Sequence, residues 1–306
     1  MGAAHPEGPA VKVFYSPDYA ASPHAFDITL KSQWVAESLL RDPIDGVELV
    51  RPHSLDVGEL AAVHDLQYVE AVHYGTPRGL AGSPGLTWDE DLWTATTAAA
   101  GGMVDAALVG LRTGGVAGSL SSGLHHACRA SGRGFCTFNG LVLAARAALD
   151  DGAESVLIVD FDAHCGGGTA SLMQSDPRIW QADVSVDWFD FYDPTDRCQP
   201  TLVSEGEQYL AACTQALSRI EHIGPNFDLV LYNAGMDPYE GCDTGGLDGI
   251  TKEVLEAREN LLFRWCQERK MPVAFALAGG YVSAHLDEKE LVDLHRLTIA
   301  EASLLD

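Results

Sequence analysis

Acidic and imidazole side chains alternate at the end of one apolar run in this 306-residue chain. Asp160, Asp162 and His164 follow the apolar residues 156–159 at intervals of two residues. If the strand stays extended here, the three side chains share one face. Asp237 closes another apolar run and offers a third ligand to a cation held by Asp162 and His164. Three protein ligands and an open position are typical of catalytic zinc, and Fe²⁺ or Co²⁺ suits the same donors.

Two adjacent histidines close a further apolar run. His125 and His126 follow residues 116–120 and point in different directions, so they could take different roles. One could remove a proton from a metal-activated water, and the other could stabilise charge on the substrate. Tyr281 follows two glycines and could donate its hydroxyl to a developing oxyanion. Each of these residues alone is also explained as a cap, core or rim residue, and only the combination favours a catalytic site.

The segments between these residues predict an α/β fold. Short β-rich apolar runs alternate with helical patterns, which is typical of βαβ units in a three-layer αβα fold with a mainly parallel sheet. Ligands bind such sheets beyond the carboxyl ends of the strands, where the polar residues above lie. The expected strands span residues 11–15, 47–50, 116–120, 156–161, 179–186, 229–232 and 273–277, and the expected helices span 30–40, 92–111, 140–149, 208–223, 254–267 and 288–305.

The composition limits the domain organisation and the classes of binding partner that we expect. No Pro/Gly/Ser-rich linker divides the chain, which predicts a single domain over residues 1–306. The formal net charge of −25 argues against nucleic acid and anionic membranes as partners. The same charge could steer a cationic substrate or simply keep the protein soluble. Seven cysteines without a C-x-x-C pair, and a start unlike a secretory signal, predict reduced thiols in a cytoplasm.

Several motifs together resemble the histone deacetylase and acetylpolyamine amidohydrolase family, which has the arginase/deacetylase fold. The resemblance is strongest at Leu-His-His-Ala (124–127), Gly-Phe-Cys-Thr-Phe-Asn (134–139), Asp-Phe-Asp-Ala-His (160–164), Ala-Gly-Met-Asp (234–237) and Ala-Gly-Gly-Tyr (278–281). It implies one zinc ion on Asp162, His164 and Asp237, and a general base at His126. His125 would be an electrostatic partner oriented by Asp160, and Tyr281 would polarise the scissile carbonyl.

The resemblance also implies the surroundings of the metal. Gly134, Phe135 and Tyr192 would line an acyl-lysine channel, although aromatic pairs are often plain core. A monovalent cation, K⁺, would be held in part by Asp160, Asp162 and Ser185. Relatives that bind two manganese ions carry further aspartates at the positions of Gly166 and Gly235, so a single divalent metal is expected.

The implied reaction is hydrolysis of an acylated amine, either acetyl-lysine or an acetylated small amine or polyamine. The alternative is a weakened or inactive module that binds acyl-amines, and a homo-oligomer stays open. Gly167 favours that alternative, because the family has Asp or Asn there to orient the second histidine. Asp187 stands near the position where many relatives have His. Residues 76–88 lack the rim Asp of protein deacetylases, which gives weight to a small-molecule substrate.

Overall fold

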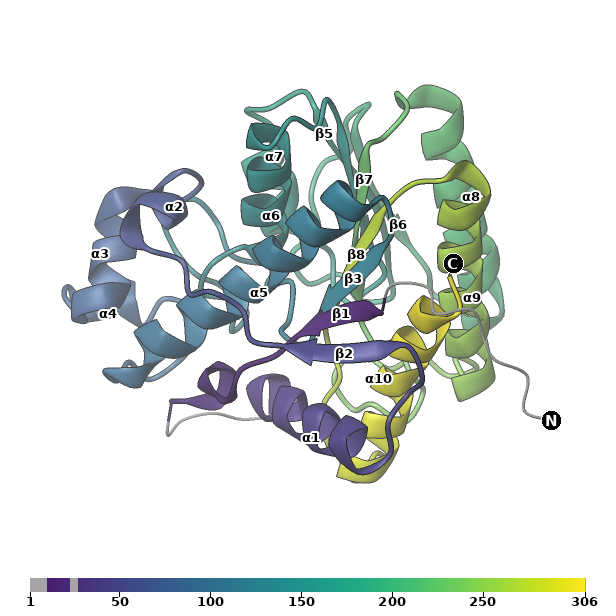
Figure 1. Cartoon of the computed structure of the whole chain (residues 1–306), viewed down its shortest axis with the longest axis horizontal. Helices are drawn as coiled ribbons and strands as arrows, with labels where there is room; N and C mark the ends of the chain where they lie inside the picture. Colours follow the sequence, from purple (N-terminus) through teal and green to yellow (C-terminus); the bar gives the residue numbers. More distant parts are fainter. Residues whose placement is uncertain (1–9, 23–26, 306) are drawn as a thin grey trace.

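One parallel sheet of eight strands organises the protein (Figure 1). The computed structural model describes residues 10–22 and 27–305. The strand order is β2-β1-β3-β8-β7-β4-β5-β6, and every pairing is parallel, which confirms the predicted fold class. The strands are β1 (Val11–Phe14), β2 (Val47–Val50), β3 (Val116–Ser119), β4 (Val156–Asp160), β5 (Ile179–Ser185), β6 (Cys198–Leu202), β7 (Leu229–Ala234) and β8 (Val273–Leu277).

The seven predicted strands are present, and β6 is the strand that the sequence pattern missed. It pairs with β5 alone and forms an edge of the sheet. Its sequence, Cys-Gln-Pro-Thr-Leu, has little apolar character, and a proline is tolerated in a strand mainly at an edge. An edge strand that is only partly buried therefore gives a weak sequence signal.

Helices cover both faces of the sheet (Figure 1). One layer contains α5 (Asp91–Thr113), α6 (Gly140–Asp150) and α7 (Gly167–Met173), with the short α2 (Val57–Ala61), α3 (Leu66–Tyr74) and α4 (Arg78–Ala81) at its outer end. The other layer contains α1 (Asp27–Arg41), α8 (Tyr209–Ile223), α9 (Lys252–Arg269) and α10 (Glu288–Ser303). Two 3₁₀ turns, η1 (Pro17–Ala20) and η2 (Gly206–Gln208), complete the described elements.

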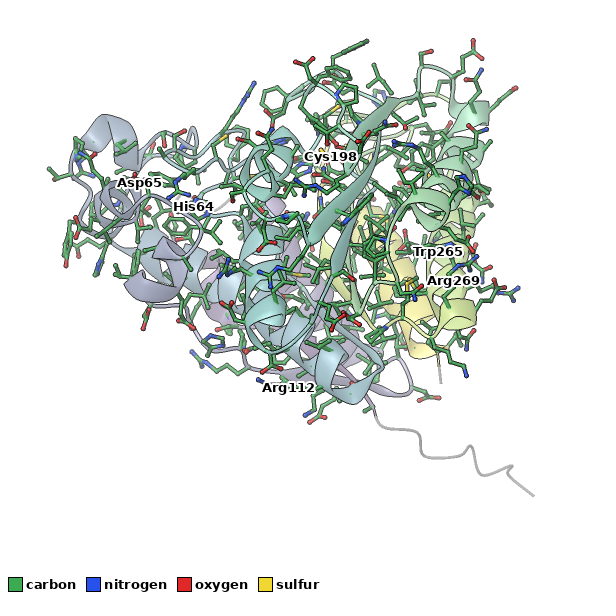
Figure 2. The ribbon with its side chains drawn as sticks, turned by 90° about the horizontal axis from the view of Figure 1, so that it is seen from above. His64, Asp65, Arg112, Cys198, Trp265 and Arg269 are labelled. Atoms are coloured by element: carbon green, nitrogen blue, oxygen red, sulfur yellow. The ribbon has the colours of Figure 1, made fainter. Side chains whose placement is uncertain are left out.

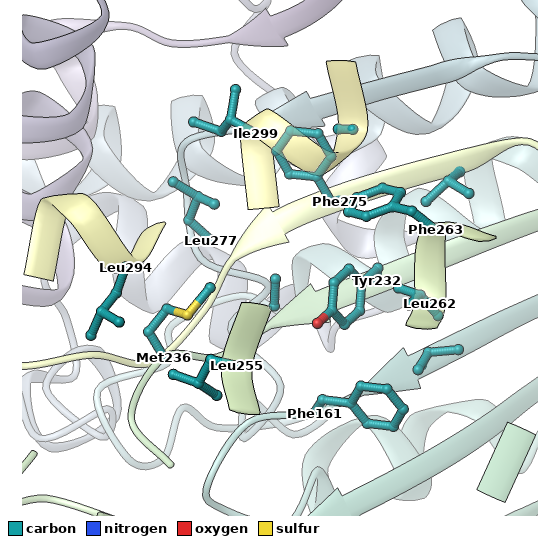
Figure 3. Close-up of a cluster of buried hydrophobic side chains, with 14 of the residues drawn as sticks. Phe161, Tyr232, Met236, Leu255, Leu262, Phe263, Phe275, Leu277, Leu294 and Ile299 are labelled. Carbon is teal, nitrogen blue, oxygen red and sulfur yellow. The ribbon is translucent and has the colours of Figure 1, made fainter. Parts of the chain in front are cut away.

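Residues of β4 alternate between two hydrophobic cores, one on each face of the sheet. Leu157 and Val159 join the core that lies under α8, α9 and α10, part of which is shown in Figure 3. Val156 and Ile158 join the core under α5 and α6. A strand buried on both faces is continuously apolar, which is the pattern that the sequence has there.

Helix α5 is a core helix. It is long and apolar enough to cross a membrane, but 67% of its most apolar window is buried inside the protein. Gly101 and Gly102 explain how it packs so closely. A Cβ at Gly101 would lie 1.9 Å from the carbonyl oxygen of His53, and one at Gly102 would lie 2.0 Å from the Tyr19 hydroxyl. The glycine pair therefore serves close packing of the helix.

The strand order brings five chain segments to one edge of the sheet. Strands β3, β8, β7, β4 and β5 are consecutive neighbours, so the residues that follow them lie side by side. The register pairs Asp160 of β4 with Asn233 of β7, and Asn233 with Ala276 of β8. Residues that are 73 and 43 positions apart in the chain thus meet at these strand ends.

Candidate metal centre and active site

Three buried ligands converge beyond β4 and β7. Asp162 and His164 follow β4, Asp237 follows β7, and one ligand atom from each lies within 4.8 Å of the others. We call these three residues the metal group. Among the described residues, Asp237 Oδ2 has no hydrogen-bond partner, although His164 Nδ1 lies 3.1 Å away. Buried carboxylates are normally paired or coordinate a metal, so the group fits a cation.

The electrostatics of the metal group also call for a cation. Burial by itself would lower the pKa of His164, but Asp162 and Asp237 outweigh it and raise that pKa to about 11. Burial and the neighbouring Asp162 raise the pKa of Asp237 to about 6. A site that binds a proton this strongly has an excess of negative charge, which a divalent metal would neutralise.

Backbone amides hold the carboxylates of the metal group in place. The Gly279 N–H donates to Asp162 Oδ2 at 2.7 Å, and the Ala163 N–H donates to Asp237 Oδ1 at 3.1 Å. A Cβ at Gly279 would lie 2.1 Å from Asp237 Oδ2. The glycine after β8 is therefore required for the close approach of backbone and carboxylate.

Gly166 and Gly235 stand at the two positions where a second divalent metal would need carboxylate ligands. A Cβ at Gly235 would lie 2.5 Å from Asp162 Cα, and one at Gly166 would lie 2.6 Å from Asp160 Oδ2. There is no space for longer acidic side chains at these positions as the chain is folded. The geometry is compatible with one divalent ion.

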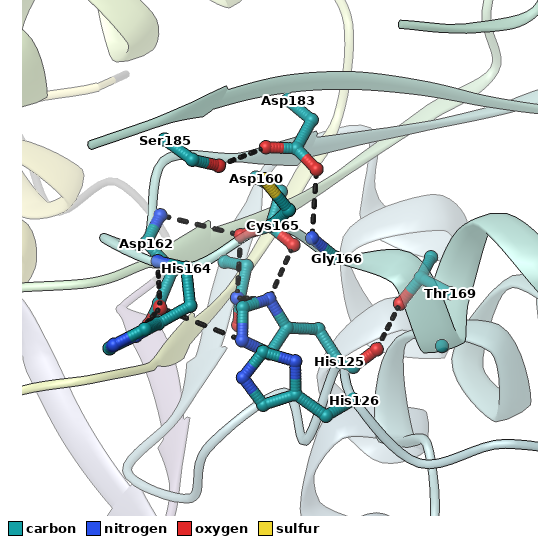
Figure 4. Close-up of polar contacts among 12 residues, drawn as sticks. His125, His126, Asp160, Asp162, His164, Cys165, Gly166, Thr169, Asp183 and Ser185 are labelled. Atoms are coloured by element: carbon teal, nitrogen blue, oxygen red, sulfur yellow. Dashed lines mark hydrogen bonds and ion pairs between the residues drawn. The ribbon is translucent and has the colours of Figure 1, made fainter. Parts of the chain in front are cut away.

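His125 lies between carboxylates (Figure 4). Its Nδ1 lies 2.7 Å from Asp160 Oδ2, and its Nε2 lies 3.5 Å from Asp162 Oδ1. Asn233 Nδ2 donates to Asp160 Oδ1 at 2.8 Å and fixes that carboxylate in turn. Burial alone would lower the pKa of His125, but Asp160 and Asp162 raise it to about 10. These two carboxylates therefore favour the cationic form of the ring.

His126, beside it in Figure 4, has the opposite electrostatics. Burial and the adjacent His125 lower its pKa to about 4, against the opposing effect of Asp190. Its Nδ1 lies 3.0 Å from Asp190 Oδ2. Neighbouring groups whose pKa values are pushed apart can divide acid and base roles, and the neutral His126 is the one that can accept a proton.

A buried network that the sequence analysis missed supports the loop carrying these histidines. Asn139, the N-cap of α6, donates through Nδ2 to the carbonyl oxygens of His125 and Ala127, each at 3.3 Å. His64 donates through Nδ1 to the Cys128 carbonyl at 2.9 Å and accepts from the Asn139 N–H at 3.0 Å. His64 precedes α3 (Figure 2), far from the His pair in sequence.

Tyr281 follows β8 and is half-buried. Burial, and then the negative charge of Asp237 and Asp162, raises its pKa above the usual value. The hydroxyl therefore stays protonated and can act as a hydrogen-bond donor. The preceding Gly280 has φ of +140°, a conformation that glycine adopts readily.

Aromatic rings lie beside the His pair. Phe189 packs edge-on against His126, with ring centroids 4.8 Å apart, and against His164 at 6.0 Å. Phe135 is 45% exposed, and a Cβ at Gly134 would lie 2.7 Å from His126 Cδ2. Tyr192, expected at the channel, packs instead against the core under α5 and α6. Phe189, rather than Tyr192, lies beside His126 and His164.

The structure adds Asp183 to the residues expected around a monovalent cation. Ser185 Oγ donates to Asp183 Oδ1 at 2.5 Å, and the Gly166 N–H donates to Asp183 Oδ2 at 2.8 Å (Figure 4). Burial and the nearby Asp160 raise the pKa of Asp183 to about 7. The side chain of Asp162 faces His164 in the metal group.

Comparison with known proteins identifies the family. The family model of the histone deacetylase domain matches residues 29–293. The chain belongs to the histone deacetylase family. An uncharacterized protein of Picosynechococcus sp. is 33% identical over 280 residues, which cover 88% of this chain and 91% of that protein. Histone deacetylase 2 of Arabidopsis thaliana is 31% identical over 175 residues, which are 54% of this chain and 44% of that protein.

A solved structure confirms the architecture of this deacetylase-family chain. The acetylpolyamine aminohydrolase from Burkholderia pseudomallei superimposes with a TM-score of 0.77 at 17% sequence identity. The match covers 97% of this chain and 99% of that one. At this identity the likeness shows the fold, which is arginase/deacetylase-like.

Two departures from the family pattern, at Asp187 and at residues 76–88, can be located in this member of the family. Asp187 is exposed, and its Oδ1 accepts from the Phe189 N–H at 2.7 Å, so it shapes the loop that carries Phe189. Residues 76–88 contain no Asp or Glu. This segment contacts Phe135 through the Pro84 carbonyl, which accepts from the Phe135 N–H at 2.7 Å.

Proposed function

We propose that this chain is a zinc-dependent deacetylase that hydrolyses the amide of an acylated amine. The observation that carries the proposal is the buried metal group, which lies beside the adjacent histidines His125 and His126. Zinc suits this donor set, and Fe²⁺ or Co²⁺ would also bind it. A structural K⁺ near Asp160, Asp162 and Ser185 belongs to the same proposal.

The residues have distinct roles in the proposed reaction. The metal group would hold the ion, which when bound polarises the amide carbonyl and lowers the pKa of a water. His126 takes the proton of the attacking water and passes it to the leaving amine. His125, held cationic by Asp160, stabilises negative charge. Tyr281 donates its hydroxyl to the oxyanion of the tetrahedral intermediate.

We propose an acetylated small amine or polyamine as the first substrate class to test, and acetyl-lysine as the second. The loop 76–88 has no carboxylate to hold a peptide backbone, and the net charge of −25 favours cationic amines. An apolar pocket is lined in part by Leu124, Phe135 and Thr137. Leu124 directly precedes His125 in the chain, and the pocket could take an acyl group.

The setting of the enzyme is also a proposal. All seven cysteines are free thiols, which agrees with a reducing cytoplasm. We propose that residues 1–306 work as one domain, with neither nucleic acid nor membrane as a partner. A homo-oligomer is a further arrangement that sedimentation would test.

Hydrolysis with metal removal and reloading tests the proposal. We expect release of acetate from acetylputrescine or an acetyl-lysine peptide, loss of turnover after chelation, and recovery with Zn²⁺. His126→Ala should lower kcat by about 10²–10⁴-fold, as loss of a general base does. His222→Ala, at an exposed position of α8, is the matched control. Bound zinc without turnover on any acyl-amine would instead support the inactive binding module.

A further inference from the structure

A carboxylate from an unexpected segment reaches His126. We propose that Asp190, in the loop after β5, is the positioning residue that fixes the tautomer and orientation of His126. The inference rests on the proposed function, because it assigns how the proposed base is prepared. It also resolves the question raised by Gly167, which has no side chain for this task.

The contacts of Asp190 define one tautomer of His126. Asp190 Oδ2 lies 3.0 Å from His126 Nδ1, and its side chain is only 5% exposed. A carboxylate only accepts hydrogen bonds, so Nδ1 carries the proton and Nε2 keeps its lone pair. The free Nε2 is then the atom available to take a proton from water.

Asp190 can approach because residue 167 is a glycine. A Cβ at Gly167 would lie 2.2 Å from the backbone oxygen of Asp190 and 2.8 Å from its Cγ. The loop that carries Asp190 could therefore not follow its present path if residue 167 had a side chain. The two positions form a matched pair: the glycine leaves a space, and Asp190 fills it with a carboxylate.

Contacts on both sides hold Asp190 in a conformation that few residues adopt. Its φ is +60°, in the left-handed region that non-glycine residues seldom occupy. Arg133 Nη1 lies 2.7 Å from Asp190 Oδ1, and the Arg133 guanidinium also lies over the Phe189 ring at 5.1 Å. The Phe189 carbonyl accepts from the Cys165 N–H at 3.1 Å. Unfavourable backbone conformations persist where such contacts hold them, often at functional sites.

A purely structural role is the competing explanation. Asp190 Oδ2 also accepts from the Gly168 N–H at 3.0 Å, at the start of α7. A cap of this kind would change the stability of α7 but would not determine which nitrogen of His126 carries a proton. The state of the imidazole therefore separates the two roles.

The test combines imidazole NMR with kinetics. Asp190→Gly removes the carboxylate and tolerates φ of +60°, whereas Asp190→Asn keeps an acceptor of the same shape. With ¹⁵N-histidine label, we expect His126 to stay in the Nδ1–H form in the wild type and Asn variant, and to lose it in the Gly variant. In the zinc-loaded enzyme, Asp190→Gly should lower kcat about 10–100-fold with KM little changed, and Asn should restore part of it. Exposed Asp193→Asn is the control.

The outcomes separate this inference from the proposed function. An Nδ1–H tautomer that survives in Asp190→Gly contradicts the inference, even if the wild type hydrolyses acyl-amines. A lost tautomer in a chain that hydrolyses no acyl-amine supports the inference and contradicts the proposed function. If Asp190→Gly does not fold, Asp190→Asn decides: an unchanged Nδ1–H proton shift and an unchanged kcat overturn the inference, because an amide is the weaker acceptor.

Discussion

The two halves of the candidate site are built in different ways. The metal group follows β4 and β7 within a few residues, and backbone N–H groups of Ala163 and Gly279 hold its carboxylates. The loop after β5, residues 187–192, has a left-handed residue and two exposed phenylalanines. Side chains from other segments, above all Arg133 and His126, hold Asp190 in that loop.

This difference shows when the spacing of residues in the sequence predicts where a side chain lies in the fold. Strand register limits where a residue two to four positions beyond a strand end can lie, so Asp162, His164 and Asp237 could be grouped from their spacing. A loop held by side-chain contacts has no such register. The sequence pattern therefore indicated Tyr192 where the Phe189 ring lies beside His126 and His164, and it gave no sign of Asp190.

We expect the largest loss of activity from changes in the metal group, which follows strands β4 and β7. Asp237→Asn removes charge from the metal group and should lower kcat/KM by roughly a thousandfold, about 4 kcal/mol, since bound metal contributes several kcal/mol. Metal content by mass spectrometry should fall with activity. Asp243→Asn, exposed in the following loop, is the control. If Asp237→Asn kept its full metal content and activity, Asp237 would not be a ligand of the metal.

A pH experiment tests the loop that carries the His pair. Burial lowers the pKa of His64 to about 4, below its usual value of 6.5. The unfolded chain therefore binds more protons between these values, so this contribution to stability falls as pH drops from 6.5 to 4 and amounts to about 3 kcal/mol. His64→Gln should lose less stability over that window in urea unfolding than the wild type or His222→Gln. Equal losses would show that His64 does not carry this dependence.

Glycine variants should divide the two halves of the site. Gly279→Ala places a Cβ against Asp237 Oδ2 and should weaken metal binding about 10–100-fold, as changes around metal ligands do. Gly167→Ala places a Cβ against the Asp190 backbone oxygen. This variant should lower kcat about 10–100-fold while its affinity for the metal stays unchanged. Gly79→Ala, with open space around it, is the control. Loss of metal in Gly167→Ala would mean that the halves are not separable.

The smallest effect is expected at the channel wall. Phe189→Leu removes the edge-on contacts with His126 and His164, which are worth about 1 kcal/mol for an aromatic pair, and should raise KM a few-fold. Phe191→Leu is the matched control, because Phe191 packs on Trp188, 4.8 Å away, in the same loop. Steady-state kinetics on one acyl-amine substrate would compare them. A larger KM for Phe191→Leu would place the channel on the other side of the loop.

The fold was predictable to the extent that its elements are buried. The central strands β4, β7 and β8 have continuous apolar runs because both faces of the sheet are covered there, and the long helices have apolar periodicity. The partly buried edge strand β6 and the short helices α2, α3, α4 and α7 lack such signals. Helix α7 begins at Gly167 in a run of three glycines, which indicates a loop when only local sequence is considered.

The sequence by itself determined the alternation of seven strands with the long helices and the grouping of Asp162, His164 and Asp237, since spacing and strand periodicity act over a few residues. Only the tertiary structure decided what lies opposite His126. Asp190 is 64 positions away, and its approach depends on the empty space at Gly167, a contact with Arg133 and an unusual backbone angle. Such a contact depends on the packing of segments distant in the chain, which no local pattern encodes.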